Sequence, residues 1–190
     1  MAAMAKISEE QVLAERFRRG ENSAFDRIVE RYAADVAALA NRLLGWPQDV
    51  DDVVQDVFVA AFRGLRDFRG DCRLRTWLFT ITVNCCRHYR RRYLRHARWI
   101  RRNENAPSLC LSEDAQIVAI DAERFSRVRQ AVRALPTKYR EVVVLRYLQG
   151  LETAEICRLL TITANALNVR LNRARERLKG DLNELLKEES

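Results

Sequence analysis

The sequence predicts an all-α protein: two small helical domains joined by a flexible linker, the C-terminal one containing a helix-turn-helix. Apolar residues recur at spacings of three and four along most of the 190 residues, which is the period of an amphipathic helix. Six glycines and three prolines are too few for a turn-rich β fold. The helical pattern lapses once, at 103–121, where Pro, Ser and acidic residues gather. The expected domains are therefore 1–102 and 122–190, with 103–121 as the linker.

Composition favours a polyanionic partner and excludes several classes of protein. Lys and Arg outnumber Asp and Glu by 34 to 26, a net charge of +8 that suits nucleic acid. No apolar run approaches the roughly 20 residues of a membrane span, and the charged N-terminus lacks a signal-peptide core. We therefore expect a cytoplasmic protein without membrane insertion.

The sequence contains no pattern typical of an enzyme or a metal protein. The five cysteines form no CxxC pair and are expected to be reduced thiols. Cys85 and His88 lie one helical turn apart, but nothing else in the sequence completes a metal site. There is also no nucleophile–base set and no Gly-rich phosphate loop, so neither catalysis nor a cofactor is expected.

The N-terminal domain is predicted to begin with two helices. A short helical pattern covers residues 9–19 and stops at a glycine. Asn22 or Ser23 can cap a longer helix that runs to about Leu44, where a Gly-Trp-Pro sequence at 45–47 breaks it.

The third predicted helix, from about Gln48 to Leu65, has two contrasting faces. A continuous buried stripe is expected from its apolar residues, Val53, Val54, Val57, Phe58, Ala61 and Phe62. Acidic residues and one Gln gather on the opposite side of the first turns: Asp49, Asp51, Asp52, Gln55 and Asp56. Acids near a helix N-terminus stabilise the helix dipole by about 0.3–1 kcal/mol each. A docking surface for a basic protein explains the same pattern, and the residues alone leave both explanations open.

A loop and a basic helix complete the N-terminal domain. Residues 64–75 are expected to form a loop, with two glycines, alternating charge and Phe68. A helix from Thr76 to about Arg102 follows. Its first half is nearly apolar, and its second half carries seven arginines after Arg87, interleaved with aromatic rings. Arginine with aromatic residues suits phosphate contact and stacking on unpaired bases.

The C-terminal domain is predicted to contain four helices. Phe125, Val128, Val132 and Leu135 mark one that Pro136 ends, and a second begins at Thr137 and is closed by Gly150. The helix-turn-helix follows. Its first helix is expected to bury Ala154, Ile156, Leu159 and Leu160, and to break at Thr161-Ile162.

In the last helix Leu167, Leu171, Ala174 and Leu178 form one apolar stripe, and Thr163 is a suitable N-cap. Asn and Arg residues lie off the stripe, where they can read base edges or hold phosphate in a major groove.

In their order, these segments resemble the group 4, or extracytoplasmic-function, bacterial RNA polymerase sigma factors of the sigma-70 family. The resemblance covers nearly the whole chain. WPQDVDDVVQDVFVAAF resembles the acidic helix that binds core polymerase, and FRGDCRLRTWLFTITVNCCRHYRRR the segment that melts and reads the minus-ten element. LPTKYREVVVLRYLQGLETAEICRLL followed by NVRLNRARERL resembles the minus-thirty-five domain.

The resemblance implies a promoter-specificity subunit whose partners are promoter DNA, RNA polymerase core and an anti-sigma factor. On core polymerase it implies contacts with the β′ clamp coiled coil, through Asp49, Asp52, Gln55 and Asp56. It also implies the β subunit as a partner. For minus-ten DNA it implies Phe68, Arg69, Asp71, Arg73, Thr76, Asn84, Arg87, His88 and Arg91. For minus-thirty-five DNA it implies Thr163, Asn165, Asn168, Val169, Arg170, Asn172, Arg173 and Arg175.

The chain departs from the family in its last helix. Ala166, Asn168 and Val169 stand where Thr, Lys and Ser are common, so its minus-thirty-five sequence does not follow from that of relatives. Two other classes share some of the features: a conventional regulator with a C-terminal helix-turn-helix, and a helical adaptor that binds only protein. The first does not explain the acidic helix or the Arg-aromatic helix, and salt-dependent DNA retention separates the second from both DNA binders.

Overall fold

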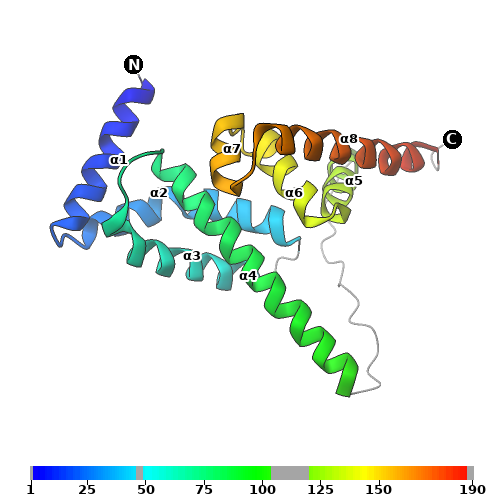
Figure 1. Ribbon diagram of the computed structural model, residues 1–190, viewed down its shortest axis with the longest axis horizontal. Helices are drawn as coiled ribbons and strands as arrows, with labels where there is room; N and C mark the ends of the chain where they lie inside the picture. Colours follow the sequence, from blue (N-terminus) through cyan, green and yellow to red (C-terminus); the bar gives the residue numbers. More distant parts are fainter. Residues whose placement is uncertain (1, 46–48, 104–119, 188–190) are drawn as a thin grey trace. The chain divides into compact units, whose positions relative to one another are not determined.

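The structure is a computed structural model that describes residues 2–45, 49–103 and 120–187, with side chains at 9–45, 49–96 and 127–180. These residues form helices and turns and no strand. They divide into two compact units, Met1–Arg91 and Arg92–Ser190, and the division falls inside one long helix (Figure 1). Most of the predicted linker, at 104–119, lies outside the described residues, as do Trp46 and Pro47.

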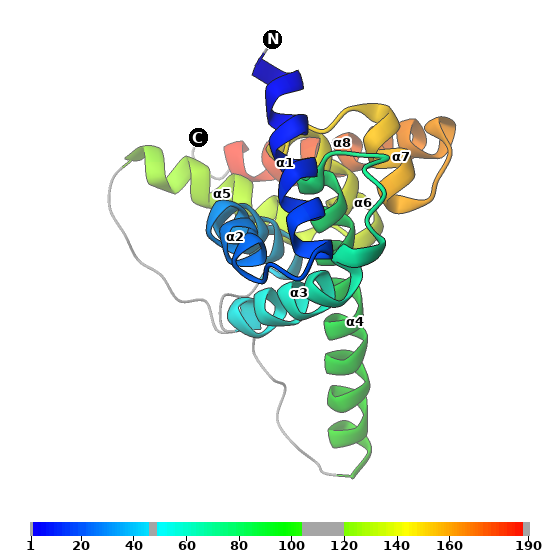
Figure 2. The same cartoon turned by 90° about the vertical axis from the view of Figure 1, so that its left-hand side faces the viewer.

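The first unit packs α1 (Ala2–Arg18), α2 (Ser23–Leu44), α3 (Val50–Gly64) and the start of α4 (Leu74–Asn103). Contacts join α1 to α2 and α2 to α3, and α1 also contacts the short turn η2 (Leu65–Asp67) (Figure 2). Gly45 ends α2 in the left-handed region at φ 87°, as the sequence predicts for a glycine after a helix. The helix predicted at 9–19 begins earlier, at Ala2.

The core of this unit corrects two sequence predictions. Val53, Val57 and Ala61 of α3 are buried, but Phe62 is 43% exposed although its ring meets those of Phe17 and Phe25 at centroid distances of 5.1 Å. The segment 64–75 is not a loop throughout. Leu65 and Leu74, both fully buried, belong to η2 and to the first turn of α4, so that burial of apolar side chains shortens the irregular part to 68–73.

The second unit consists of α5 (Ile120–Ala134), α6 (Thr137–Val143), a π-helical turn η3 (Val144–Leu148), α7 (Thr153–Leu160) and α8 (Ala164–Lys187). Part of its core is formed by Leu135, Tyr139, Val143 and Ala174, with Val132 and Leu178 packed against them. Pro136 separates α5 from α6, as predicted.

The π-helical turn explains why one apolar residue departs from the predicted pattern. Gln149 N–H donates to the Val144 carbonyl at 2.9 Å, which is an i to i+5 bond that widens the helix. Side chains after the wider turn no longer follow the 3.6-residue period. Leu148, the last residue of this turn, is 47% exposed although it is apolar, and its neighbour Tyr147 is also exposed.

The helix-turn-helix forms where the sequence places it. Thr161 ends α7 in the left-handed region at φ 55°, and Ile162 N–H donates to the Cys157 carbonyl at 3.0 Å. Thr163 then caps α8, because its hydroxyl oxygen accepts a bond from Ala166 N–H at 3.2 Å. Ile156, Leu159 and Leu160 are buried in α7 as predicted, whereas Ala154 is exposed.

Candidate nucleic-acid and polymerase interfaces

The exposed side of α8 carries the residues predicted to contact minus-thirty-five DNA. Leu167, Leu171 and Ala174 are buried, so the apolar stripe faces the unit's core. The polar candidates face outward: Thr163, Asn165, Asn168, Asn172, Arg173 and Arg175 are exposed, Val169 is 42% exposed and Arg170 is half-buried. A capped helix with amides and guanidiniums on its outer side can enter a major groove and contact base edges and phosphates.

Two arginines of α8 form hydrogen bonds with tyrosine hydroxyls, one from α6 and one from η3. Arg175 donates from Nε and Nη2 to the Tyr147 hydroxyl oxygen at 3.1 and 2.9 Å, and from Nη1 to Asn172 Oδ1 at 2.9 Å. Arg173 forms a hydrogen bond with the Tyr139 hydroxyl, which lowers the pKa of Tyr139. The hydrogen bonds thus orient both guanidinium groups on the exposed side of α8.

Neither tyrosine was predicted as part of this surface. Tyr147 lies in η3, inside the helix predicted from Thr137 to Gly150, and 28 residues separate it from its arginine partner Arg175. The available signal was an aromatic residue four positions after Val143, a spacing that periodicity alone assigns to the buried face.

In the first unit, the predicted minus-ten residues of the segment 68–76 divide between surface and interior. Arg69, Asp71 and Arg73 are exposed. Phe68 is 6% exposed, with its ring 5.2 Å from that of Trp77, and Thr76 is buried as well. The exposed charges can reach DNA directly, whereas Phe68 and Thr76 shape the segment from inside.

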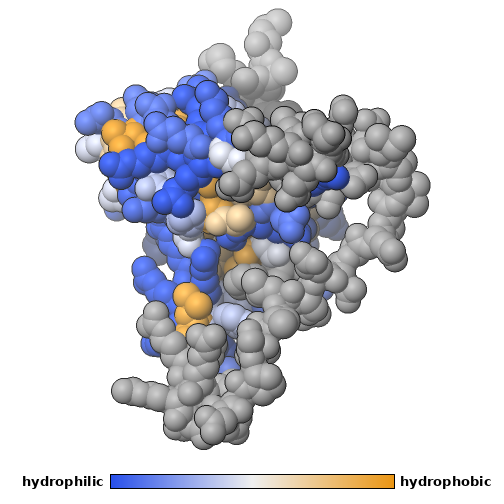
Figure 3. Space-filling view, turned by 90° about the vertical axis from the view of Figure 1, so that its right-hand side faces the viewer, coloured by the Kyte–Doolittle hydropathy of each residue, from blue (hydrophilic) through white to orange (hydrophobic). Residues whose placement is uncertain are grey.

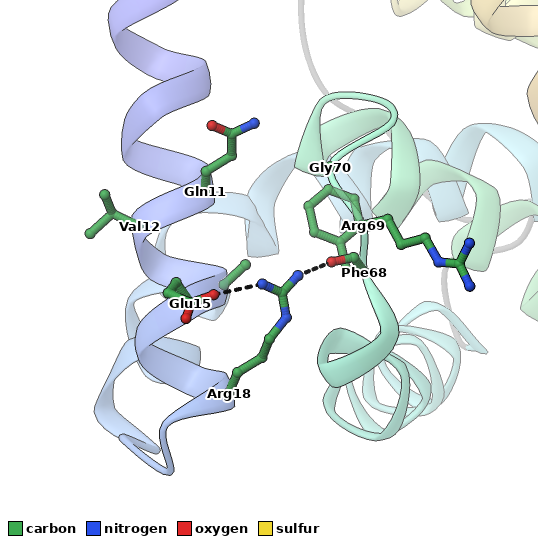
Figure 4. A pocket seen from close by; sticks show the side chains of 8 residues that line it. Gln11, Val12, Glu15, Arg18, Phe68, Arg69 and Gly70 are labelled. Carbon is green, nitrogen blue, oxygen red and sulfur yellow. Dashed lines mark hydrogen bonds and ion pairs between the residues drawn. The ribbon is translucent and has the colours of Figure 1, made fainter.

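An open cavity of about 390 Å³ lies between this segment and α1. It is lined by Gln11, Val12, Ala14, Glu15, Arg18, Phe68, Arg69 and Gly70 (Figure 4). The cavity combines an exposed apolar side chain, Val12, with amide, carboxylate and guanidinium groups. Such a mixture suits a flat heterocycle that needs both an apolar wall and hydrogen-bond partners. The α1 residues of the cavity were not predicted, because their role depends on which segment α1 packs against.

The candidates in α4 form one stripe along the helix. Asn84, His88 and Arg91 are exposed and Arg87 is half-buried, at spacings of three and four that place them on the same side. The neighbouring thiols lie deeper: Cys86 is buried, and burial, together with the charge of Asp56, raises the pKa of Cys85. The arginines of α4 that follow His96 are Arg98, Arg101 and Arg102, and the structure does not describe their side chains.

The acidic residues at the start of α3 face outward. Asp52, Gln55 and Asp56 are exposed, and Asp49, the residue before the helix, is half-buried. They share one side of α3, opposite Val53, Val57 and Ala61 in the core. This patch presents concentrated negative charge on a basic protein.

On the face that Figure 3 shows, the described surface is largely hydrophilic, with hydrophobic side chains in small separate patches. Within the described residues no helix is long and apolar enough to cross a membrane, and no group of His, Cys, Asp and Glu side chains has the arrangement of a metal site.

Comparisons with known proteins agree with this arrangement. Residues 28–102 match the sequence profile of sigma-70 region 2, and residues 125–178 that of sigma-70 region 4. The ECF RNA polymerase sigma-E factor of Escherichia coli (strain K12) is 30% identical over 206 aligned positions, which cover 97% of this chain and all of the relative.

Two solved structures are similar to most of the chain. CnrH, solved in complex with the cytosolic domain of CnrY, matches with a TM-score of 0.67 and 31% identity over 93% of this chain and 98% of CnrH. The sigma factor RpoE of Bartonella quintana, solved with the anti-sigma factor NepR, matches with a TM-score of 0.65 and 22% identity, over 84% of this chain and 96% of that one.

Proposed function

The chain belongs to the extracytoplasmic-function (ECF) sigma factors of the sigma-70 family, and we propose how its residues divide the work of promoter recognition. Sigma factors are transcription regulators, and this one directs RNA polymerase to promoters during initiation. It does so as a binding subunit without a catalytic site or a cofactor of its own, in the cytoplasm, where core polymerase works.

The second unit recognises the minus-thirty-five element through α8. Asn165, Asn168 and Val169 contact base edges, and Arg170, Arg173 and Arg175 hold phosphates, with Thr163 at the start of the helix and Asn172 beside Arg175. The support is the capped, outward-facing polar side of α8 and the tyrosine bonds that orient two of its arginines. Ala166 and Val169 offer methyl groups where relatives of this family commonly carry hydroxyls, so thymine methyls become favourable contacts.

The first unit opens and reads the minus-ten element. One nontemplate base leaves the duplex and enters the cavity beside 68–70, while Arg69, Arg73, Arg87 and Arg91 hold the strand and Asn84 and His88 contact it along α4. Asp71, exposed in the same segment, is placed to accept from a base amino group. The observation that carries this assignment is the cavity with its mixed apolar and polar lining, bordered by exposed arginine. Stacking, pocket and phosphate contacts then replace the lost base pair without ATP.

The acidic side of α3 binds core polymerase at the β′ clamp coiled coil, with Asp49, Asp52, Gln55 and Asp56 as contacts, and the second unit contacts the β subunit. The exposure of Asp52, Gln55 and Asp56 near the start of α3 supports the polymerase-binding role. An anti-sigma factor is a further partner, since CnrH, a relative with 31% identity over most of the chain, was solved with another protein bound.

Run-off transcription with purified core RNA polymerase on a library of promoter fragments tests the assignment. We expect the protein to activate a defined subset of fragments that share two sequence elements. Transcription that is equal with and without the protein, despite duplex binding by the protein alone, would contradict it.

A further inference from the structure

One side of α1 lies along the whole segment that connects α3 to α4. Residues 10, 11, 14, 15 and 18 have helical spacing, so they share one face, and all of them contact the segment 66–74 or line the cavity beside it. Figure 4 shows Arg18 between α1 and Phe68, with Gln11 about two turns further along α1, on the side of Gly70.

Arg18 holds the start of the segment. Its Nε donates to the Arg66 carbonyl at 3.2 Å, and its Nη2 donates to the Phe68 carbonyl. The third nitrogen, Nη1, donates to Glu15 at 2.7 Å, which fixes the guanidinium from the side of its own helix. All three nitrogens of one side chain thus have partners, and two of these are backbone carbonyls of the segment.

Glu10 holds the end of the segment. Its side chain is buried, and Oε2 accepts a bond from the Leu74 N–H at 2.9 Å. Leu74 is the first residue of α4, whose first amides have no partner within the helix, so Glu10 caps α4 from a distant helix. Oε1 accepts from the hydroxyl of Tyr32 in α2, which keeps the carboxylate in place.

The middle of the segment also follows the surface of α1. Gly70 has φ +80°, a conformation that favours glycine, and Gln11 Nε2 is 3.4 Å from the position that a Cβ would occupy there. Between the two anchor points, the backbone at 68–70 therefore passes close to α1. The open cavity lies beside these residues.

We propose that Glu10 and Arg18 are positioning residues that keep the segment 68–73 in the shape required to receive the unpaired minus-ten base. The proposal rests on the proposed function of the first unit. A segment already in its binding shape avoids the ordering cost at the moment of melting, whereas a segment that occupies that shape for a tenth of the time binds about tenfold more weakly.

The test uses the holoenzyme formed by the full chain with core polymerase. The probe is a single-stranded nontemplate oligonucleotide that spans the minus-ten element of a promoter found by run-off transcription, with 2-aminopurine at successive positions to report unstacking. Arg18→Ala is expected to weaken oligonucleotide binding roughly tenfold, since it removes two charge-assisted bonds to the segment. Affinity for core polymerase should change less than twofold.

Arg19→Ala is the matched control. Arg19 is the next residue, pairs with the same Glu15 at 3.5 Å and is 72% exposed, so the change removes the same charge without touching the segment. We expect less than a twofold effect on oligonucleotide binding. Equal losses in the two variants would show a general effect of charge and overturn the proposal.

Glu10 supplies a second, independent comparison. Glu10→Gln keeps an oxygen for the Leu74 amide and an NH₂ group that can donate to the Tyr32 hydroxyl, so it should bind the oligonucleotide like the wild type. Glu10→Ala should lose about tenfold. Parallel losses of oligonucleotide and core-polymerase affinity in Arg18→Ala and Glu10→Ala would mean a merely structural role and refute positioning. If the wild-type holoenzyme itself does not bind the oligonucleotide, the proposed minus-ten function of this unit fails instead.

Discussion

Reversing the charge of Asp56 separates the two explanations of the acidic helix. Asp56 is exposed and is the seventh residue of α3, which begins at Val50. The effect of a helix dipole fades within the first turn, so Asp56 contributes little to helix stability. We therefore expect Asp56→Arg to change the free energy of unfolding by no more than about 0.5 kcal/mol.

Binding to core polymerase should respond more strongly. Exposed ion pairs contribute about 0.2–1 kcal/mol, and reversal adds a repulsion of similar size to the lost attraction. The sum of about 0.4–2 kcal/mol corresponds to binding that is roughly two- to thirtyfold weaker. Fluorescence anisotropy of the labelled protein titrated with core polymerase measures it, and the effect should shrink at high salt.

Glu30→Arg is the control for this prediction. Glu30 is exposed and is the eighth residue of α2. The change therefore introduces the same two units of charge at a similar distance from the N-terminus of another helix in the same unit. It should bind core polymerase almost as the wild type does. Equal weakening by both reversals, or unchanged affinity in Asp56→Arg, would remove the acidic side of α3 from the interface.

Three further perturbations test other parts of the structure. Asn168→Ala should change which duplexes are selected from a promoter library, while a uniform loss across sequences would mean that Asn168 contacts backbone phosphate. Tyr147→Phe should weaken binding of a minus-thirty-five duplex about two- to fivefold, because it removes the hydroxyl that holds Arg175. In an Arg175→Ala background the same change should have no further effect. An equal effect in both backgrounds would exclude the role of Tyr147 in positioning Arg175. Burial raises the pKa of Tyr32 above its usual 10, and the hydrogen bond to Glu10 and the charge of Glu10 raise it further. The positive charges of Arg31 and Arg75 lower this pKa by a smaller amount. As the pH rises, Tyr32 therefore loses its proton at a lower pH in the unfolded chain than in the folded protein. The stabilisation from this group should be fully present below pH 10, and above it the free energy of unfolding should fall by up to about 1.4 kcal/mol per pH unit. Urea unfolding of Tyr32→Phe at several pH values should lack this contribution to the pH dependence.

Local patterns were sufficient to predict most helices and the helix-turn-helix. The apolar stripe of α8 can be read from spacings of three and four, because residues that share a face of a helix recur at that period. The Thr163 cap was equally accessible, since a cap bonds to an amide three residues away. The outward position of Asn168 and Arg175 follows from the same stripe, since both residues lie off it. In the same way, the acidic side of α3 follows from the apolar residues on the opposite side of that helix.

Burial was predicted less well where it depends on distant segments. Phe68 and Thr76 have the residue types of DNA contacts, yet tertiary packing puts both inside the first unit. Phe62 has the type of a core residue and remains partly exposed, although its ring contacts those of Phe17 and Phe25. The π-helical turn had no signal in the sequence, and it changes which residues of 144–148 face outward.

The sequence by itself determined the fold class, the order of the helices and the polar faces of α3 and α8, since each depends on residues within a few positions of one another. Only the tertiary structure decided what fixes the segment before α4. Arg18 reaches a carbonyl 50 residues away and Glu10 an amide 64 residues away, so no local pattern contains these bonds. They form because folding brings α1 against the start of α4, where buried backbone groups need hydrogen-bond partners.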